Sequence, residues 1–486
     1  MIFNSYTFLI FFVSVATSYF IIPHRFRWLL LLLASYYFYM CWRPEYIILI
    51  IFSTLIDYFA GIKIGQISEK HRRRKYLILS LATNLGLLFS FKYFNFFNDS
   101  LRMAFQKFNL FYGVPDFDVL LPVGISFYTF QTLSYTIDVY RGERAPEKHL
   151  GIFALYVAFF PQLVAGPIER STRLLTQFYN RNYFDCRRVT DGLKLMVWGM
   201  FKKVVVADRL SLFVDHIYSY PNAFSGKILT VATIFFAFQI YCDFSGYSDI
   251  AIGSAKVLGY DLMKNFRRPY FARSIPEFWK RWHISLSTWF RDYLYIPLGG
   301  NRVSPIMWHF NIVIVFVLSG LWHGANWTFI IWGLLHGIYY LFSVHTTNIR
   351  TRMAQSFGIV RYPNIHLWLN RFVTFTLVCF AWIFFRSNSF SDAKVIVARL
   401  LTGWNQPFIF SPEVRLTNTL PISATEFYVS IILIMVVVVF HYLQEHQRKL
   451  LSLGAWWFRW GIYLALCLLI MNMGVAEEIP FIYFQF

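Results

Sequence analysis

Charge is scarce in this 486-residue sequence. Asp, Glu, Lys and Arg together make up 14% of the residues, whereas they make up roughly a quarter of an average soluble protein. Apolar residues make up 57% and aromatic residues 21%, and the mean hydropathy is +0.47. Because this composition cannot supply a surface that faces water everywhere, it excludes an ordinary soluble enzyme. We predict a protein that lies mostly in the lipid bilayer.

Cysteine and acidic residues are scarce as well. Only five cysteines occur, each alone and without CxxC spacing, namely Cys41, Cys186, Cys242, Cys379 and Cys467. This pattern indicates neither a disulfide framework nor a zinc site, and we expect no metal. Lys and Arg number 45 against 25 Asp and Glu. In so apolar a chain this excess is typical of cytoplasmic loops, so we expect no nucleic-acid partner.

Several catalytic signatures are absent. The sequence contains no GxSxG elbow, phosphate-binding loop, HExxH or dinucleotide fingerprint, which removes the usual support for a hydrolase, an NTP-driven transporter or a metalloprotease. No internal repeat and no low-complexity linker divides the chain. We therefore predict a single integral-membrane domain at 1–486, with N-terminal helices at 1–118, a motif-bearing core at 119–345 and C-terminal helices at 346–486.

The sequence does contain a long series of apolar runs. They lie at 1–22, 28–41, 46–60, 77–97, 119–137, 153–164, 193–206, 228–241, 312–321, 327–342, 372–385, 427–441 and 456–471. A helix needs about 20 residues to cross the bilayer core, so the shorter runs suit tilted, re-entrant or interfacial helices. We predict an all-α polytopic bundle of roughly 9 to 13 spanning, re-entrant and interfacial helices.

Basic loops set the expected orientation. Clusters of Lys and Arg at 23–27 and 70–75 follow the first and third runs, and another lies at 170–188. Loops rich in Lys and Arg stay in the cytoplasm. We therefore expect the N-terminus on the extracytoplasmic side.

Between 246 and 309 the apolar pattern breaks into charged and aromatic residues. Ser274, Pro276 and Glu277 form a good helix start, with a capping hydroxyl, a first-turn proline and a Glu three residues after the cap. We predict one continuous helix from there, on which Trp279, Trp282, His283 and Leu286 share a face by their three- and four-residue spacing. One interpretation is structural, in which the helix lies at the membrane interface and His283 only packs. The other is functional, in which His283 is catalytic or binds the donor.

A second histidine stands between two apolar runs. His323 follows Trp322 and is flanked by glycines that let another helix or a ligand approach. Asn326 and Trp327, three and four residues later, can orient its ring. The structural alternative is a hydrogen bond between helices, and His336 on the following run has the same ambiguity with a weaker case.

Acidic residues near the membrane interior are few. They are Asp57, Asp138, Asp243 and Asp249. Asp243 and Asp249 either pair with Arg267 and Arg268 or line a polar tunnel, and we favour a structural role.

Four ordered strings carry a family resemblance. They are FFPQLVAGPI at 159–168, YCDFSGYSDIAIG at 241–253, RWHISLS at 281–287 with its continuation to 300, and GLWHGANW at 320–327. The chain resembles the membrane-bound O-acyltransferases, strongly over 121–340, and within them the branch that O-acetylates alginate and peptidoglycan. The string YIPLGGNR at 295–302 favours that branch over the related D-alanyl transferases of teichoic acid modification.

The resemblance implies a single acyltransferase domain built as a helical bundle around a central tunnel, in a bacterial inner membrane. It implies His323 as the catalytic histidine and His283 as the second, donor-side one. Further residues expected to bind the donor or line the tunnel are Trp282, Trp322, Asn326, Trp327, Arg267, Arg268, Lys280, Arg281, Asp243 and Asp249.

We therefore predict transfer of acetyl groups from a cytoplasmic donor, acetyl-CoA, to an extracytoplasmic polysaccharide, with no tightly bound cofactor. The donor enters over the basic face of Arg267, Arg268, Lys280 and Arg281. Family resemblance suggests a periplasmic SGNH-type acetyltransferase as partner. The alternatives are D-alanyl transfer, a transporter, which predicts inverted internal symmetry, and a scaffold in a polysaccharide secretion complex, which predicts that His323 tolerates substitution.

Overall fold

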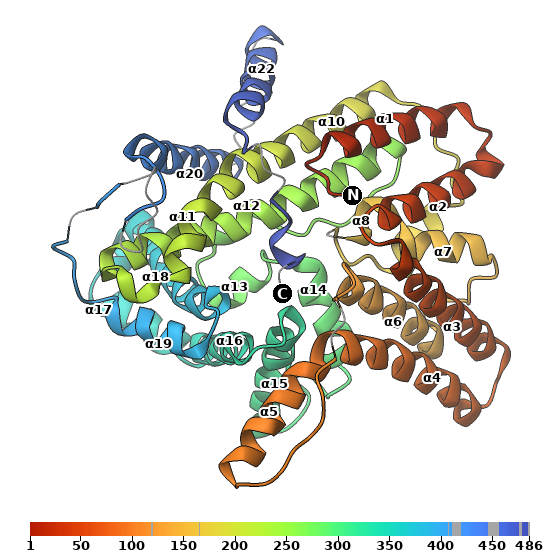
Figure 1. Ribbon diagram of the computed structural model, residues 1–486, viewed down its shortest axis with the longest axis horizontal. Coiled ribbons are helices and arrows are strands. Elements are labelled where there is room, and N and C mark those ends of the chain that lie inside the picture. Colours follow the sequence, from red (N-terminus) through yellow and green to blue (C-terminus); the bar gives the residue numbers. More distant parts are fainter. Residues whose placement is uncertain are drawn as a thin grey trace. The chain divides into compact units, whose positions relative to one another are not determined.

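The computed structural model describes residues 1–117, 120–164, 166–406, 408–410, 419–445, 456–475 and 479–484 (Figure 1). In this part of the chain the regular structure is helical, apart from one isolated bridge between Phe410 and Leu420. The chain divides into two compact units, which we describe separately. The first unit comprises 1–196 and 247–264, and the second comprises 197–246 and 265–486.

The first unit is built from helices of the N-terminal half. They are α1 (Tyr6–Ile21), α2 (His24–Met40), α3 (Ile47–Gln66), α4 (Lys70–Leu88), α5 (Phe94–Lys107), α6 (Ile125–Arg141), α7 (Leu150–Ala158), α8 (Phe160–Leu163), α9 (Ser171–Gln177) and most of α10 (Cys186–Met200). Short π and 3₁₀ segments join some of them, at Phe89–Tyr93 and Pro44–Tyr46.

The core of the first unit contains a buried polar cluster. The Asp57 side chain on α3 is fully buried among α4 and α6. Its carboxylate accepts hydrogen bonds from Ser80 Oγ at 2.5 Å, from Asn84 Nδ2 at 2.9 and 3.0 Å, and from Thr136 Oγ1 at 3.4 Å. Because a buried polar group costs little once it is hydrogen-bonded, the cluster ties three apolar helices together.

A second buried carboxylate in the first unit belongs to Glu169, directly after the predicted motif at 159–168. One oxygen accepts the backbone N–H of Met263, and the other is buried without a hydrogen-bond partner in the described part of the chain. Burial raises the pKa of Glu169 to about 7. This carboxyl group therefore keeps its proton to a higher pH in the folded protein than a solvent-exposed Glu does.

The second unit contains the C-terminal helices. They are α11 (Asp208–Ser219), α13 (Ile275–Trp279), α14 (Ile284–Phe290), α15 (Pro305–His323), α16 (Trp327–His345), α17 (Thr347–Ser356), α18 (Pro363–Arg386), α19 (Phe390–Arg399), α20 (Ala424–Glu445) and α22 (Trp456–Met473). A π segment at Phe201–Ala207 precedes α11, and the long helix α12 (Gly226–Leu258) runs from this unit into the first.

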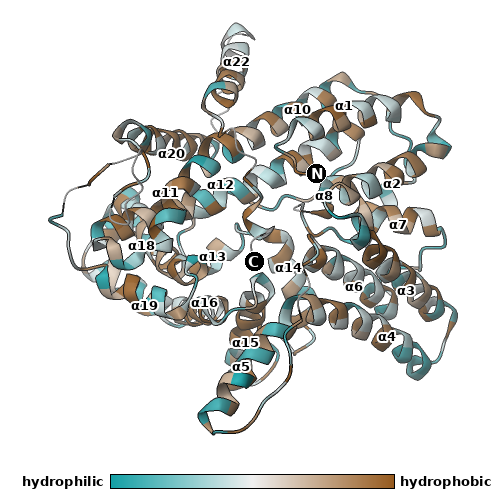
Figure 2. Cartoon of the chain, viewed as in Figure 1, coloured by the Kyte–Doolittle hydropathy of each residue, from teal (hydrophilic) through white to brown (hydrophobic). Residues whose placement is uncertain are grey.

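Seven stretches in the described part of the chain are long and apolar enough to cross a membrane. They are Pro44–Gln66, Lys70–Lys107, Gly226–Leu258, Pro305–His323, Trp327–His345, Pro363–Arg386 and Ala424–Glu445. Figure 2 shows the apolar residues along these helices, for example on α3. Two shorter apolar helices, Tyr6–Ile21 and Trp460–Met473, accompany them. The prediction of a multi-pass, all-α membrane protein is confirmed, and long and short apolar helices both occur.

Helices α15 and α16 form an antiparallel pair with closely apposed backbones (Figure 1). A Cβ on Gly320 would lie 2.2 Å from the carbonyl oxygen of Phe329, and one on Gly333 would lie 2.3 Å from that of Phe316. Only glycine permits this approach. The close helix approach expected beside His323 is thus present, and it fixes the end of α15 against α16.

Candidate active site

His323 is the last residue of α15, and its side chain is only 2% exposed. Aromatic rings surround it on several sides. Their centroids lie 5.0 Å away for Trp322, 5.1 Å for Trp332, 5.3 Å for Phe385 and 5.4 Å for Tyr483. The second predicted histidine, His283, lies 6.3 Å away between ring centroids. The structure therefore brings together two histidines that are far apart in the sequence.

The hydrogen bonds of His283 define its tautomer. Its Nδ1 lies 3.1 Å from Asn265 Oδ1, which also accepts from the Ser285 hydroxyl at 2.9 Å and from the Ser285 backbone N–H at 3.3 Å. Because a backbone N–H can only donate, the Asn265 atom must be the oxygen, and His283 Nδ1 must carry a proton. The lone pair therefore resides on Nε2.

The Nε2 atom of His283 is buried and has no hydrogen-bond partner in the described part of the chain. Burial of the ring lowers the pKa of His283 to about 3. The imidazole is therefore neutral at physiological pH and presents an acceptor lone pair. An acceptor of this kind is what a general base provides.

The prediction of one continuous helix from Ser274 through His283 is wrong. The helix start is as expected, because Ser274 Oγ accepts the Glu277 N–H at 3.3 Å and Glu277 Oε2 accepts the Arg273 N–H at 2.8 Å. The helix ends at Trp279, however, and His283 adopts a left-handed backbone with φ +42° before α14 begins. A non-glycine residue with this backbone is strained, and such strain concentrates at functional sites.

The two tryptophans beside the break are buried. Trp282 is fully buried and stacks on Phe278 at 5.6 Å between centroids. Trp279 donates its indole N–H to Nδ1 of His336 at 3.3 Å. His336 is fully buried and accepts this bond, so it links α13 to α16. This is the structural role, a hydrogen bond between helices, that the sequence left open for His336.

A cavity of about 370 Å³ lies beside α15, and its lining includes Ile312, Phe316 and Ser319 of that helix. Its lining residues include the basic Lys280 and Arg291 and the aromatic Trp279 and Phe316. Its lining on α15 continues to Ser319, one helical turn before His323. The lining does not include His323 itself.

Two of the four residues of the expected basic face are paired with carboxylates. Arg268 Nε and Arg281 Nη2 each lie 3.0 Å from the Glu445 carboxylate on α20, and Arg281 Nη2 also lies 2.7 Å from Glu277 Oε1. These two arginines therefore join α20 to the loop after α12 and to α13. Arg267 and Lys280 are exposed.

The acidic residues do not form the pairs considered from the sequence. Asp243 lies 2.9 Å from Lys203 Nζ, not beside Arg267 or Arg268. The same ammonium lies 2.7 Å from Asp208 Oδ1, and all three side chains are buried. Burial raises the pKa of Asp208 in spite of the neighbouring ammonium. Asp249 belongs to the first unit.

A short C-terminal segment at 479–484 lies on this charged group. The N–H of Ile482 donates to Asp243 Oδ2 at 2.8 Å, and Lys203 Nζ donates to the carbonyl of Pro480 at 3.4 Å. Anchored in this way, Tyr483 places its ring against His323 and its buried hydroxyl among the same aromatic side chains. Sequence analysis missed the contributions of Asn265, Lys203 and Tyr483.

Two other residues expected at the site have different surroundings. The Asn326 side chain caps α16 by accepting the Thr328 N–H at 3.0 Å, and its Nδ2 donates to the carbonyl of Asn388 at 3.3 Å. Trp327 is 50% exposed. Asn326 thus fixes the start of α16 and not the ring of His323, while Trp322 contacts both His283 and His323. No group of three His, Cys, Asp or Glu side chains suited to a metal occurs among the described residues.

Comparisons with known proteins bear on this arrangement. The model of the membrane-bound O-acyltransferase family matches residues 149–385, which include both histidines. The probable alginate O-acetylase AlgI of Pseudomonas aeruginosa is 41% identical over 398 residues, covering 81% of this chain and 73% of that protein. The chain belongs to the membrane-bound O-acyltransferase family. It is therefore an acyltransferase, and the predicted resemblance is confirmed.

Two further relatives show the range of this membrane-bound O-acyltransferase group. The peptidoglycan O-acetyltransferase of Helicobacter pylori is 37% identical over 393 residues, covering 76% of this chain and 72% of that protein. The teichoic acid D-alanyltransferase of Bacillus subtilis is 25% identical over 291 residues, covering 57% of this chain and 71% of that protein. Identity is thus higher to the two named O-acetylating enzymes than to the named D-alanyl transferase.

Proposed function

We propose that this protein is an inner-membrane O-acetyltransferase that takes acetyl groups from a cytoplasmic thioester, acetyl-CoA, for O-acetylation of an extracytoplasmic polysaccharide such as alginate or peptidoglycan. The observation that carries the proposal is the neutral His283, whose Nε2 lone pair is buried beside His323. The identity to O-acetylating relatives supports acetyl as the transferred group.

The chemistry needs a base, a proton donor and a group that stabilises negative charge. The acceptor hydroxyl oxygen attacks the thioester carbonyl carbon, the C–S bond breaks, and the hydroxyl proton finally passes to the departing thiolate. We assign proton transfer to the histidine pair, with His323 at the acceptor hydroxyl and His283 on the donor side. Their 6.3 Å separation lets one reacting centre lie within reach of both rings.

Charge on the carbonyl oxygen needs a hydrogen-bond donor. The indole N–H of Trp332 is buried without a hydrogen-bond partner in the described part of the chain, and the indole packs edge to face on His323. A donor that is already in place in a site with little water stabilises a developing oxyanion strongly. We therefore assign this role to Trp332, a residue that the sequence did not single out.

The cavity along α15 gives the donor its route. Its charged lining at Lys280, with the exposed Arg267 nearby in sequence, suits the phosphates of coenzyme A, while the aromatic wall suits the pantetheine arm. Ser319 lines the cavity one helical turn before His323, and we place the thioester at this end of it. Arg268 and Arg281, which pair with Glu445, have a positioning role instead.

The acceptor side involves a partner in this proposal. The acetyl group passes to a periplasmic SGNH-type acetyltransferase, which then esterifies the polysaccharide, or goes directly to the sugar. We place the N-terminus on the extracytoplasmic side, because the basic segments 23–27 and 70–75 are then cytoplasmic.

The test measures ester-linked acetate in purified cell-wall and exopolysaccharide fractions from cells with and without the protein. We expect loss of the acetate in the strain that lacks it and in the His323→Ala variant, with membrane insertion unchanged. His345→Ala serves as the matched control, because His345 is an exposed histidine at the C-terminal end of α16, whereas His323 lies just before the start of that helix.

Near-normal acetylation by His323→Ala would remove this residue from catalysis and favour the transporter or scaffold. If D-alanine ester replaces acetate in the fractions from wild-type cells, the donor assignment is wrong while the acyl-transfer mechanism stands.

A further inference from the structure

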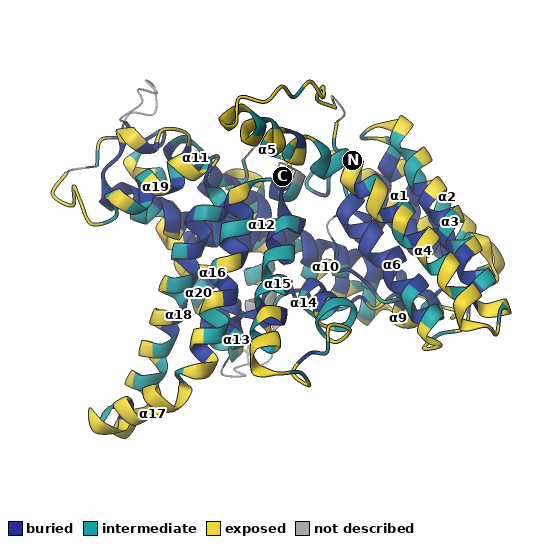
Figure 3. Ribbon diagram, turned by 90° about the horizontal axis from the view of Figure 1, so that it is seen from below, coloured by how far each residue is buried: buried dark blue, intermediate teal, exposed yellow. Residues whose placement is uncertain are grey.

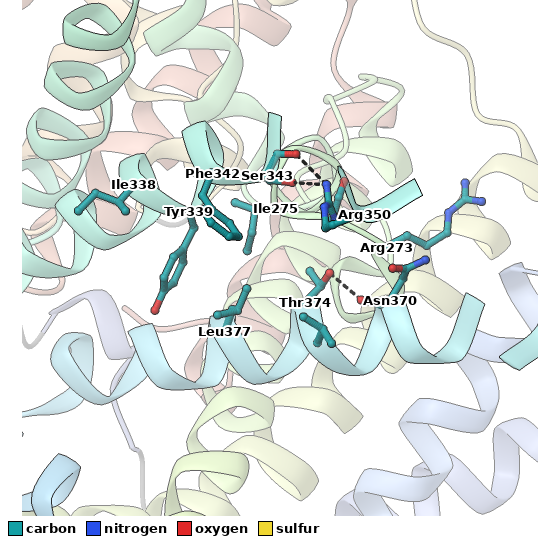
Figure 4. A pocket seen from close by; sticks show the side chains of 12 residues that line it. Arg273, Ile275, Ile338, Tyr339, Phe342, Ser343, Arg350, Asn370, Thr374 and Leu377 are labelled. Carbon is teal, nitrogen blue, oxygen red and sulfur yellow. Dashed lines mark hydrogen bonds between the residues drawn. The ribbon is translucent and has the colours of Figure 1, made fainter. Parts of the chain in front are cut away.

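A second cavity of the second unit is separate from the candidate active site. It has a volume of about 340 Å³ and lies between α16, α17, α18 and the start of α13. Figure 4 shows its lining side chains, with Arg273, Arg350 and Asn370 towards one end and Tyr339 and Leu377 towards the other. None of these residues belongs to the machinery proposed above. The cavity thus combines a cationic, polar end with an apolar end.

Two arginines form the cationic end. Arg350 on α17 is exposed, and its Nη2 donates to the carbonyl of Ser343 at 2.7 Å. This contact orients the guanidinium, yet Arg350 makes no ion pair with a carboxylate in the described part of the chain. Arg273 lies 3.4 Å from Glu277 through its Nε, and its two Nη atoms have no hydrogen-bond partner among the described residues. No acidic residue lines the cavity itself.

Aliphatic and aromatic side chains form the apolar end. Ile338 and Phe342 come from α16, and Val373 and Leu377 come from α18. Both helices are long and apolar enough to cross the membrane. A groove between two such helices faces lipid hydrocarbon unless something covers it.

The order of these residues along the helices follows membrane depth. Helix α16 ends at His345 and α18 begins at Pro363, with the exposed α17 between them (Figure 3). Of the polar residues, Ser343 and Asn370 come from the parts of α16 and α18 nearer to α17, and Arg350 comes from α17 itself. Ile338 and Leu377 lie further along each span. The lining thus changes from charged to apolar in the same direction as a phospholipid, from its head group to its chains.

We propose that this cavity binds an anionic glycerophospholipid, with the phosphate at Arg350 and Arg273 and one acyl chain in the groove between α16 and α18. Guanidinium groups bind phosphate through paired, charge-assisted hydrogen bonds. Charge complementarity favours an anionic over a zwitterionic lipid, because the lining carries two positive charges and no negative one. The apolar groove favours a lipid over a free phosphate ion, which has nothing to place there.

The experiment uses the full chain in nanodiscs made of phosphatidylcholine alone or with a minority of phosphatidylglycerol. A ligand that binds only the folded state raises Tm by mass action. We expect phosphatidylglycerol to raise Tm by a few degrees for the wild type. Arg350→Gln combined with Arg273→Gln should lose most of that increase, with a smaller loss for each single variant.

Arg352→Gln is the matched control. Arg352 is an exposed arginine on the same helix as Arg350 and does not line the cavity. It should keep the full phosphatidylglycerol effect, so that a general response to surface charge is separated from binding in the cavity. Equal loss in Arg352→Gln and Arg350→Gln would overturn the proposal.

A second measurement counts the lipids that co-purify with each variant by mass spectrometry. The double variant should retain fewer phosphatidylglycerol molecules per protein than the wild type or Arg352→Gln. Inorganic phosphate added to phosphatidylcholine nanodiscs should leave Tm unchanged. A Tm increase with phosphate alone, or equal lipid retention by all variants, would show that the cavity is not an anionic-lipid site.

Discussion

Two buried polar clusters of this molecule differ in whether every hydrogen-bonding atom of the central side chain has a partner. In the first unit, the Asp57 carboxylate is fully buried and both of its oxygens accept hydrogen bonds from neutral donors. In the second unit, His283 is equally buried, but one ring nitrogen is held by Asn265 and the other has no partner in the described chain. Burial of a polar side chain is common to both. We associate the reaction with His283 because its acceptor without a partner lies beside a second buried histidine, His323.

The largest expected effect is on catalysis at His283. Asn tolerates the left-handed backbone that His283 adopts, so His283→Asn should fold while lacking a ring nitrogen at the position of Nε2. We expect acetyl transfer to fall by about 10²–10⁴-fold, as for loss of a general acid–base group, with Tm little changed. The measurements are acetate transfer per purified protein and thermal melting in the same detergent. Full activity in a folded variant would contradict the role.

Asp57 should behave in the opposite way. Asp57→Ala leaves the Ser80 hydroxyl and the Asn84 amide buried without their acceptor, and each lost partner costs about 1–3 kcal/mol. We expect a marked fall in Tm and in membrane yield, whereas Asp57→Asn, which keeps one acceptor oxygen, should cost less. Transfer activity per folded molecule should stay near the wild-type value. A selective loss of activity at normal Tm would show that Asp57 takes part in the reaction and does not only stabilise the fold.

Glu169 gives a pH dependence of stability. Its pKa is raised by burial to about 7 in the folded state from the ordinary value of 4.5, so the folded protein binds the proton more tightly than the unfolded chain. This contribution is fully present below the unfolded pKa and is lost as pH rises from about 4.5 to 7, by about 3 kcal/mol at most. Tm measured across this range should fall more steeply for the wild type than for Glu169→Gln. Parallel curves would show that the carboxyl group is not perturbed.

The smallest effect is expected at His336. His336→Phe preserves a ring against Trp332 and Trp279 but leaves the Trp279 indole N–H without its acceptor, which costs about 1–2 kcal/mol. Thermal melting should show a modest decrease, and acetyl transfer should remain within about two-fold of wild type because the residue lies outside the proposed chemistry. A large loss of transfer without a loss of stability would assign His336 to the reaction.

Hydropathy predicted the class of fold correctly but not the extent of every helix. The run at 228–241 was expected to end before Asp243, yet α12 continues to Leu258. The polar residues Asp243, Ser245 and Ser248 look like an interruption in the sequence. They are buried in the folded chain, and Asp243 pairs with Lys203. A sequence pattern scores polarity residue by residue and therefore cannot register a partner supplied by another helix.

The two histidines could be selected from the sequence because a titratable ring in apolar surroundings is unusual. Their environment could not be predicted in the same way. Asn265 holds His283 through a loop, and Tyr483 reaches His323 from the C-terminal segment, so neither contact follows a helical spacing. The break before His283 was missed because Ser274 and Glu277 favour a helix locally, while the left-handed backbone at His283 has no signal in residue type.

The glycine contacts between α15 and α16 have a mechanical consequence. Because Gly320 and Gly333 bring backbone against backbone, neither helix can slide or rotate past the other without a clash of main-chain atoms. The two helices must therefore move together as one rigid body, which carries His323 at the end of α15. Adaptation to a new acceptor then has to come from the elements around the α15–α16 pair, since the pair itself has no freedom to repack.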